Sequence, residues 1–266
     1  MALNSEQLTR YSRHILLPEL GRAGQEKLRA ARVAVLGLGG LGCPAALYLA
    51  AAGVGTLGLI DGDKAELSNL QRQILHFNAD LGRPKVASAG DKLRALDPGI
   101  ALELHELRLE AGNALEILAG YDLVLEGTDN FAAKFLASDT CVSLGLPLVQ
   151  AGILRFEGQL MAVDPGRSAC YRCVFEASPP PDAVPNCAEA GVLGAVAGVM
   201  GSLMASEALK ILLGLGEPLY DRMLAFDAKK GRFREIPLKR RAGCPSCSRA
   251  GSRFEPQAEA AAACEA

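Results

Sequence analysis

A run of six residues, GLGGLG from Gly37 to Gly42, has the G-x-G-x-x-G spacing that is typical of nucleotide-binding loops. It follows the apolar run Val33 to Leu36, a predicted strand, and precedes a helix predicted from Pro44 to Ala52. Glycines let the backbone approach a ligand, and the start of the helix offers unpaired N–H groups to an anion. The loop therefore predicts nucleotide binding, with a tight turn that binds nothing as the alternative. Its candidate contacts are Gly37, Gly39, Gly40 and Gly42.

A carboxylate ends the second predicted strand, which runs from Thr56 to Asp61. Asp61 lies 19 residues after Gly42, and a carboxylate at this place can accept hydrogen bonds from ribose hydroxyls. NAD-dependent oxidoreductases share this fingerprint, but the cations and amide side chains that follow suit a chain of phosphates better than a nicotinamide. These polar residues are Asp63, Ser68, Asn69, Arg72, Gln73 and Lys85.

A second polar loop, GTDN, carries Asp129 and Asn130 directly after the predicted strand Asp122 to Glu126. Open α/β sheets bind their ligands at the carboxyl ends of parallel strands. An aspartate beside a phosphate is a reasonable Mg²⁺ ligand. We therefore predict that Asp129 holds Mg²⁺ next to the nucleotide.

Four cysteines form two C-x-x-C pairs, Cys170 with Cys173 and Cys244 with Cys247. Two such pairs can supply four thiolates in a tetrahedron, the usual structural zinc site. A stretch of 70 residues separates the pairs, so the fold must bring them together. A redox pair is the alternative for Cys244 and Cys247 alone, but no βαβ start accompanies them. We predict that the four cysteines bind zinc.

Alternating strands and helices predict the scaffold that positions these groups. Further predicted strands are Ala101 to Leu107, Pro147 to Ala151 and Gly158 to Val163, and further helices are Pro84 to Leu96, Gly112 to Leu118 and Phe131 to Leu144. Met223 to Phe226 and Phe233 to Leu238 predict an antiparallel hairpin. The predicted fold class is α/β: a Rossmann-like doubly wound, mostly parallel sheet extended by antiparallel strands, with a zinc site made of four cysteines.

Two other segments predict helices. Asn4, with Gln7 three residues later, is a plausible helix cap, and the stripe that follows leaves Arg13 on a basic face that is solvated in the simplest interpretation. Ala190 to Ser206 contains no charge over 17 residues, whereas a membrane span needs about 20. We expect a helix buried in the core or at a subunit interface, where its small residues allow close packing.

Composition excludes several classes of protein. The chain has 266 residues, 50% of them hydrophobic, and 28 basic against 30 acidic residues. It has no dense basic block, which argues against nucleic acid as a partner. The N-terminus lacks a secretory signal pattern, so we expect a cytoplasmic protein. One domain is predicted over 1–248, followed by a disordered Ala/Glu-rich tail over 249–266.

Taken in order, these motifs resemble the MoeB/ThiF/HesA family of ubiquitin-activating-like adenylyltransferases. The resemblance runs from about Ser5 to Cys247 and is closest to the molybdopterin-synthase branch. It rests on RYSRH, GLGGLG, IDGDKAELSNLQRQ, GRPKV, EGTDN, EGQ, CYRC, the loop Cys187 to Gly191, and CPSC. It implies a homodimer that uses ATP and Mg²⁺ to adenylate the C-terminal Gly-Gly carboxylate of a small ubiquitin-fold sulfur-carrier protein, with release of pyrophosphate.

The resemblance also implies roles for single residues. Gly40 would approach the nucleotide backbone and Asp61 its ribose, and Arg13 would reach across the dimer to the partner subunit's phosphates. Asn69, Arg72 and Lys85 would hold the phosphates, and Asp129 the metal. Cys187 would form a covalent link to the carrier, or is an exposed loop cysteine without a role. No sulfurtransferase-like segment follows Cys247, so we expect a separate sulfur donor protein.

Adenylation fits the residues present, because a C-terminal carboxylate is already ionised and needs no general base. The three histidines form no catalytic constellation, and we interpret His76 and His105 as structural. Expected carriers are the small subunit of molybdopterin synthase, a thiamin-pathway carrier or another sulfur carrier. Two functions of other classes stay open: an NAD-binding oxidoreductase, and a zinc-stapled scaffold that binds the carrier without catalysis.

Overall fold

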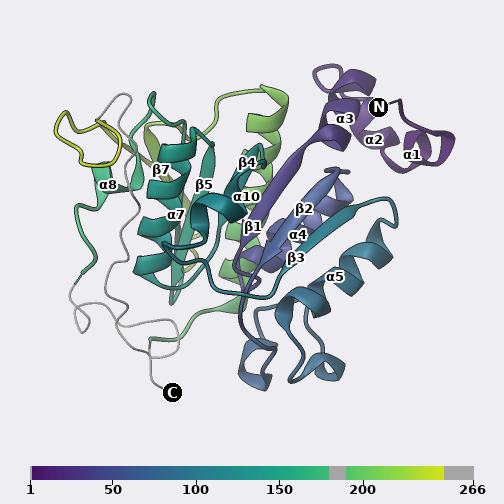
Figure 1. Ribbon diagram of the computed structural model, residues 1–266, viewed down its shortest axis with the longest axis horizontal. Coiled ribbons are helices and arrows are strands. Elements are labelled where there is room, and N and C mark those ends of the chain that lie inside the picture. The colour runs from purple at the N-terminus through teal and green to yellow at the C-terminus, as the bar shows by residue number, and fades with distance from the viewer. Residues whose placement is uncertain (1, 180–189, 249–266) are drawn as a thin grey trace.

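The computed structural model describes residues 2–179 and 190–248, and in this part of the chain eight strands form one sheet (Figure 1). Their order is β3-β2-β1-β4-β5-β6-β7-β8. The parallel strands are β1 (Arg32–Leu36), β2 (Thr56–Ile60), β3 (Ala101–His105), β4 (Leu123–Glu126) and β5 (Leu148–Leu154). The antiparallel extension is β6 (Glu157–Val163), β7 (Arg222–Asp227) and β8 (Arg232–Pro237). The predicted fold class is confirmed.

Helices cover both faces of this sheet. Alternate residues of β1 point to opposite sides, so Val33 and Val35 join one core cluster while Ala34 and Leu36 join the other. The first cluster is covered by α3 (Gly21–Ala30), α4 (Gly42–Ala51), α5 (Lys85–Leu96) and α10 (Gly194–Leu213). The second is covered by α6 (Ala114–Leu118), α7 (Phe131–Leu144) and α8 (Tyr171–Val174). Figure 1 shows α7 in front of the sheet and α10 behind it.

Helix α10 is the predicted apolar helix, and it begins at Gly194 rather than Ala190. By length and composition alone it could cross a membrane, but 44% of its apolar window is buried inside the fold. A Cβ at Gly201 would lie 2.4 Å from the carbonyl oxygen of Leu41, so the glycine permits close packing on the start of α4. The predicted helix and its close packing on the core are confirmed, whereas a subunit interface along it stays a prediction.

The N-terminal helix differs from the prediction. Asn4 and Gln7 form the predicted capping box, but two short helices, α1 (Ser5–Arg10) and α2 (Ser12–Ile15), replace one. They separate at Tyr11, whose ring packs against Gly53 and whose hydroxyl donates to Asp97 at 2.6 Å. These contacts across the fold break the helix that local spacing favours.

Most remaining boundaries agree with the predictions to within two residues. Helix α7 has the predicted bounds, because Asn130 caps its start and Gly145, with φ of 70°, ends it. Strand β5 continues to Leu154 instead of Ala151, since its last residues pair with β6 through a tight turn. Short 3₁₀ turns, η1 (Leu67–Asn69) and η2 (Asn78–Asp80), shape the connection after β2. The predicted tail over 249–266 lies outside the described residues, so the domain boundary remains a prediction.

Candidate active site

The glycine loop leaves the carboxyl end of β1 as a tight turn into α4. Gly37 has φ of +86°, a conformation that favours glycine, and a Cβ at Gly42 would lie 1.8 Å from the Gly37 carbonyl oxygen. Gly40 lies beneath α10 and Arg72, since its Cβ would be 3.1 Å from Ala197 and 3.5 Å from the Arg72 stem. Sterics thus require glycine at Gly37 and Gly42, space at Gly40 is tight, and the loop presents its backbone beside Arg72.

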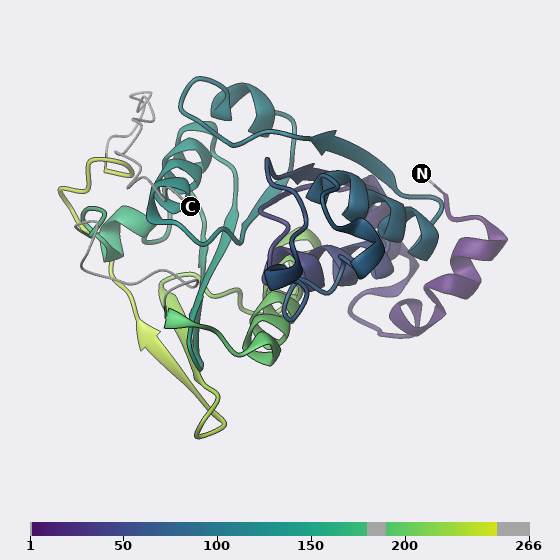
Figure 2. The ribbon, with the colours of Figure 1, turned by 90° about the horizontal axis from the view of Figure 1, so that it is seen from below.

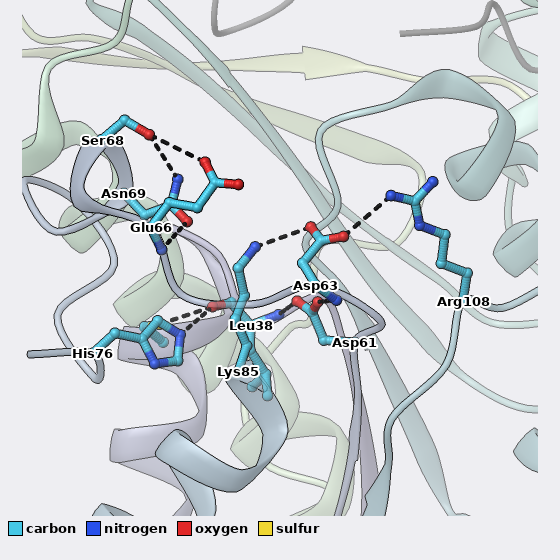
Figure 3. Close-up of polar contacts among 10 residues, drawn as sticks. Leu38, Asp61, Asp63, Glu66, Ser68, Asn69, His76, Lys85 and Arg108 are labelled. Atoms are coloured by element: carbon cyan, nitrogen blue, oxygen red, sulfur yellow. Dashed lines mark hydrogen bonds and ion pairs between the residues drawn. The ribbon is translucent and has the colours of Figure 1, made fainter. Parts of the chain in front are cut away.

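Asp61 fixes this loop from the end of β2 (Figure 3). Its Oδ2 accepts from the Leu38 N–H at 2.7 Å, and its Oδ1 accepts from the Asp63 N–H at 2.8 Å. Burial raises the pKa of Asp61 above its ordinary value. A carboxylate oxygen has two lone pairs, so these bonds leave acceptor capacity for a ribose hydroxyl.

His76 holds the same loop from the other side. Its Nε2 lies 3.0 Å from the Leu38 carbonyl oxygen and its Nδ1 lies 2.9 Å from the Ser88 hydroxyl. Burial lowers the pKa of this imidazole, which favours the neutral ring. Both polar groups of the Leu38 backbone are therefore bonded, which agrees with a structural histidine.

Lys85 starts α5 and extends its amino group toward the loop region between β2 and α5. Its side chain is 8% exposed, and its Nζ lies 3.0 Å from Asp63, which Arg108 also approaches at 3.2 Å (Figure 3). Burial alone would raise the pKa of Asp63, but the two cations outweigh it and hold that pKa below its ordinary value. Asp63 is thus an anionic anchor for Lys85.

The turn η1 and the segment after it supply the remaining polar residues of this edge. Arg72 donates to the Ser68 carbonyl oxygen at 3.0 Å, and Asn69 accepts from the Glu66 N–H at 3.3 Å. Gln73 is 4% exposed, and its Oε1 has no hydrogen-bond partner in the described part of the chain. Figure 3 shows Ser68 and Asn69 on the turn near Lys85.

The GTDN loop meets the glycine loop at the edge of the sheet. A Cβ at Gly37 would lie 3.2 Å from the Gly127 carbonyl oxygen, so the loops after β1 and β4 touch. Strand order changes direction between these strands, and such switch points are where doubly wound sheets bind ligands. Asp129 is exposed there, whereas the Asn130 side chain accepts from the Ala133 N–H at 2.8 Å and caps α7.

Two charged residues behind this loop escaped the sequence analysis. Glu126, at the end of β4, is fully buried and its Oε2 lies 2.8 Å from the Lys134 ammonium in α7. Each is a charged residue in an otherwise apolar stretch, which was the signal available in the sequence. Sequence spacing does not connect His76 to Leu38, because that contact joins residues far apart in the chain.

The four cysteines come together on the α7 side of the sheet. Their sulfurs all lie within 4.8 Å of one another, with Cys170 to Cys244 at 3.6 Å and Cys173 to Cys247 at 3.4 Å. A tetrahedron with metal–sulfur bonds of about 2.3 Å requires about 3.8 Å between sulfurs. The cluster therefore has the size and donor set to hold a metal ion.

The other cysteines divide into two groups. Cys43 and Cys141 are buried as expected, and burial raises the pKa of Cys43 to about 12. Such thiols are unreactive at neutral pH. Cys187 lies outside the described residues, so its proposed covalent role remains a prediction.

Arg13 is the site residue that the fold does not bring to the glycine loop of its own chain. It is exposed on α2, and the neighbouring Tyr11 packs against Gly53, which lies just before the start of β2. The glycine loop is at the opposite, carboxyl end of the strands. Figure 2 shows α1 and α2 projecting from the body of the molecule.

Comparisons with known proteins show the family of this chain. The chain matches the ThiF family over residues 11–246. It is 47% identical to the sulfur carrier protein adenylyltransferase of Thermus thermophilus, a match that covers 93% of each chain. It is 50% identical to the adenylyltransferase and sulfurtransferase MOCS3 of Bos taurus over 95% of this chain, but spans only 55% of that protein.

Solved structures show the same fold. Escherichia coli MccB superposes with a TM-score of 0.80 at 23% identity, over 94% of this chain and 75% of MccB. A further relative, found by sequence, is the probable adenylyltransferase/sulfurtransferase MoeZ of Mycobacterium tuberculosis. It is 47% identical over 92% of this chain, which spans 63% of that protein. The glycine loop, the polar edge of the sheet and these matches together show that the chain belongs to the ThiF family and is a MoeB/ThiF-type adenylyltransferase.

Proposed function

We propose that this enzyme adenylates the C-terminal Gly-Gly carboxylate of a small ubiquitin-fold sulfur-carrier protein and releases pyrophosphate from ATP. The observation that carries the proposal is that the glycine loop touches both Arg72 and the GTDN loop of Asp129 at one switch point. Lys85 is linked to the same loop through Asp63 and Asp61. The Thermus relative is named for acting on a sulfur carrier protein, which supports this substrate class.

The residues fit in-line attack on the α-phosphorus of ATP. The carrier's terminal carboxylate oxygen forms the new P–O bond, and the bond to the β-phosphate oxygen breaks. The carboxylate is ionised at neutral pH, so the site needs orientation and charge neutralisation rather than a base. Arg72 and Lys85 would offset the charge that grows on pyrophosphate, while Asp61 and Asn69 would orient the nucleotide.

Magnesium is the expected companion of ATP. Asp129 is an exposed carboxylate at the edge, and hard oxygen donors of this kind suit Mg²⁺, which would neutralise phosphate charge when bound. Asp63, Ser68, Gln73 and Asn130 would complete the nucleotide site. The orphan Oε1 of buried Gln73 supports this, because it leaves one acceptor for a ligand donor.

Zinc is the metal that we propose for the four cysteines. An all-sulfur tetrahedron is typical of structural zinc, and a reducing cytoplasm, where we expect the enzyme, would keep the thiols available. We also propose a homodimer in which Arg13 reaches the partner subunit's phosphates. A separate protein would then donate sulfur to the carrier adenylate.

Pyrophosphate–ATP exchange tests the function and identifies the carrier. Purified enzyme is assayed with a molybdopterin synthase small subunit, which we favour, with a thiamin-pathway carrier, and with each carrier lacking its last glycine. We expect exchange with one intact carrier and none with its truncated form. Arg72→Ala and Asp129→Ala should lower the rate at least about 100-fold without loss of carrier binding. Carrier binding without any exchange would instead support the scaffold.

A further inference from the structure

The loop that bears Asp129 is held from beneath by a buried carboxylate. Glu126 is fully buried at the end of β4, and its Oε1 accepts from the Thr128 N–H at 2.7 Å and from the Thr128 hydroxyl. Two residues later, Asn130 caps α7. The backbone is thus pinned on both sides of Asp129, whose own side chain makes no hydrogen bond or ion pair within residues 2–179 and 190–248.

The second oxygen of Glu126 binds an ammonium group. Lys134 is 7% exposed, and its Nζ lies 2.8 Å from Glu126 Oε2 and 2.6 Å from the Ala151 carbonyl oxygen. Gln150 donates to the Lys134 carbonyl oxygen at 2.9 Å. This buried network joins β4, α7 and the middle of β5.

The stability of the fold alone does not explain why Glu126 and Lys134 form a buried ion pair. Apolar residues of similar volume often stabilise a core as well as a buried ion pair does. What apolar residues cannot supply is an acceptor for both donors of Thr128. We propose that Glu126, held by Lys134, is a positioning residue that orients Asp129 toward the metal and phosphates of bound nucleotide, an inference that rests on the proposed function.

Two double variants separate positioning from stability. Glu126→Gln with Lys134→Met keeps an acceptor for Thr128, whereas Glu126→Leu with Lys134→Met removes it. Neither leaves a buried charge without its partner. Pyrophosphate exchange is measured against Mg²⁺ concentration at saturating ATP and carrier, together with the unfolding midpoint of each variant.

We expect similar midpoints, but a half-saturating Mg²⁺ concentration at least about 10-fold higher for the leucine variant than for the glutamine variant. Equal Mg²⁺ dependence in the two folded variants overturns the inference. If either double variant does not fold, Thr128→Val decides, because it removes one of the two bonds and leaves the ion pair intact. It should raise the half-saturating concentration about 2- to 5-fold, and no change overturns the inference. Absence of exchange in the wild-type enzyme would instead refute the proposed function.

Discussion

Leu38 in the glycine loop is held at both polar groups of its backbone, by Asp61 at the N–H and by His76 at the carbonyl oxygen. The carbonyl can only accept, so His76 carries its proton on Nε2 and Nδ1 accepts from Ser88. A doubly protonated ring would be repelled by the Lys92 ammonium, which also contacts Ser88. The buried setting and the nearby ammonium therefore favour a neutral imidazole at this position.

The preference of His76 for the neutral form predicts an effect of pH on the free energy of unfolding. Burial holds the pKa of His76 below its ordinary value of 6.5 in the folded state, so the unfolded chain binds the proton first as pH falls. The contribution of His76 is complete above about pH 6.5 and declines below it. The difference in free energy of unfolding between wild type and His76→Asn should narrow between about pH 8 and pH 5 in urea titrations.

Ser88→Ala is the matched control, because it removes a partner of the ring and keeps the titrating group. The difference in free energy of unfolding between Ser88→Ala and His76→Asn should therefore narrow over the same pH range. A wild-type advantage that stays constant over this pH range would contradict the account.

At the residue scale, spacing predicted the glycines, Asp61, Lys85 and the four cysteines, because each belongs to a local motif. It could not connect His76 to Leu38 or Glu126 to Thr128 and Lys134, since those contacts depend on how elements pack. It also could not show that the Asn130 side chain serves as a helix cap.

At the element scale, helix ends were predicted where caps are local. The bounds of α7 were predicted, and in the structure Asn130 caps its start and Gly145 ends it. The break at Tyr11 was missed because it follows from contacts with Gly53 and Asp97, and α3 was not predicted at all. The order of the strands was not predicted, since residue patterns alone give no order.

Packing of α10 on α4 gives a paired prediction. A Cβ at Gly201 would lie 2.4 Å from the Leu41 carbonyl oxygen, whereas a Cβ at Gly198 meets nothing within 4 Å. Gly201→Ala should lower the free energy of unfolding by about 1–3 kcal/mol, because backbone must move. Gly198→Ala should raise it by about 0.5–1 kcal/mol, since alanine favours the helix. Chemical denaturation measures both, and changes of equal sign would contradict the packing described.

At the scale of the whole molecule, the cysteine cluster joins segments about 70 residues apart in sequence. If it holds zinc, metal binding contributes on the order of 10 kcal/mol that is coupled to folding. Chelation or Cys244→Ser should lower the unfolding midpoint by at least about 10 °C. Metal analysis should find about one zinc per chain in wild type and in the Cys43→Ala control. A chelated protein with unchanged midpoint would refute the structural role.

The exposed position of Arg13 gives a prediction about the dimer. Arg13→Ala and Asp129→Ala should each abolish exchange, yet a mixture whose subunits re-assort should regain about a quarter of the wild-type rate. Half of the dimers formed at random contain one subunit of each variant. In such a hybrid, one of the two sites combines an intact Asp129 with an intact Arg13 from the other subunit, so a quarter of all sites are active. An inactive mixture, with hybrids verified by differently tagged subunits, would show that Arg13 does not act across the dimer.

The central claim is that a carrier's terminal carboxylate becomes an acyl adenylate. Mass spectrometry of the intact carrier after incubation with enzyme, ATP and Mg²⁺ tests it most directly, with pyrophosphatase present to draw the reaction forward. We predict a gain equal to one AMP less one water, located on the terminal glycine, absent with Asp129→Ala enzyme and with a carrier lacking that glycine. An intact carrier of unchanged mass, with a wild-type enzyme that binds both ATP and the carrier, would contradict the claim.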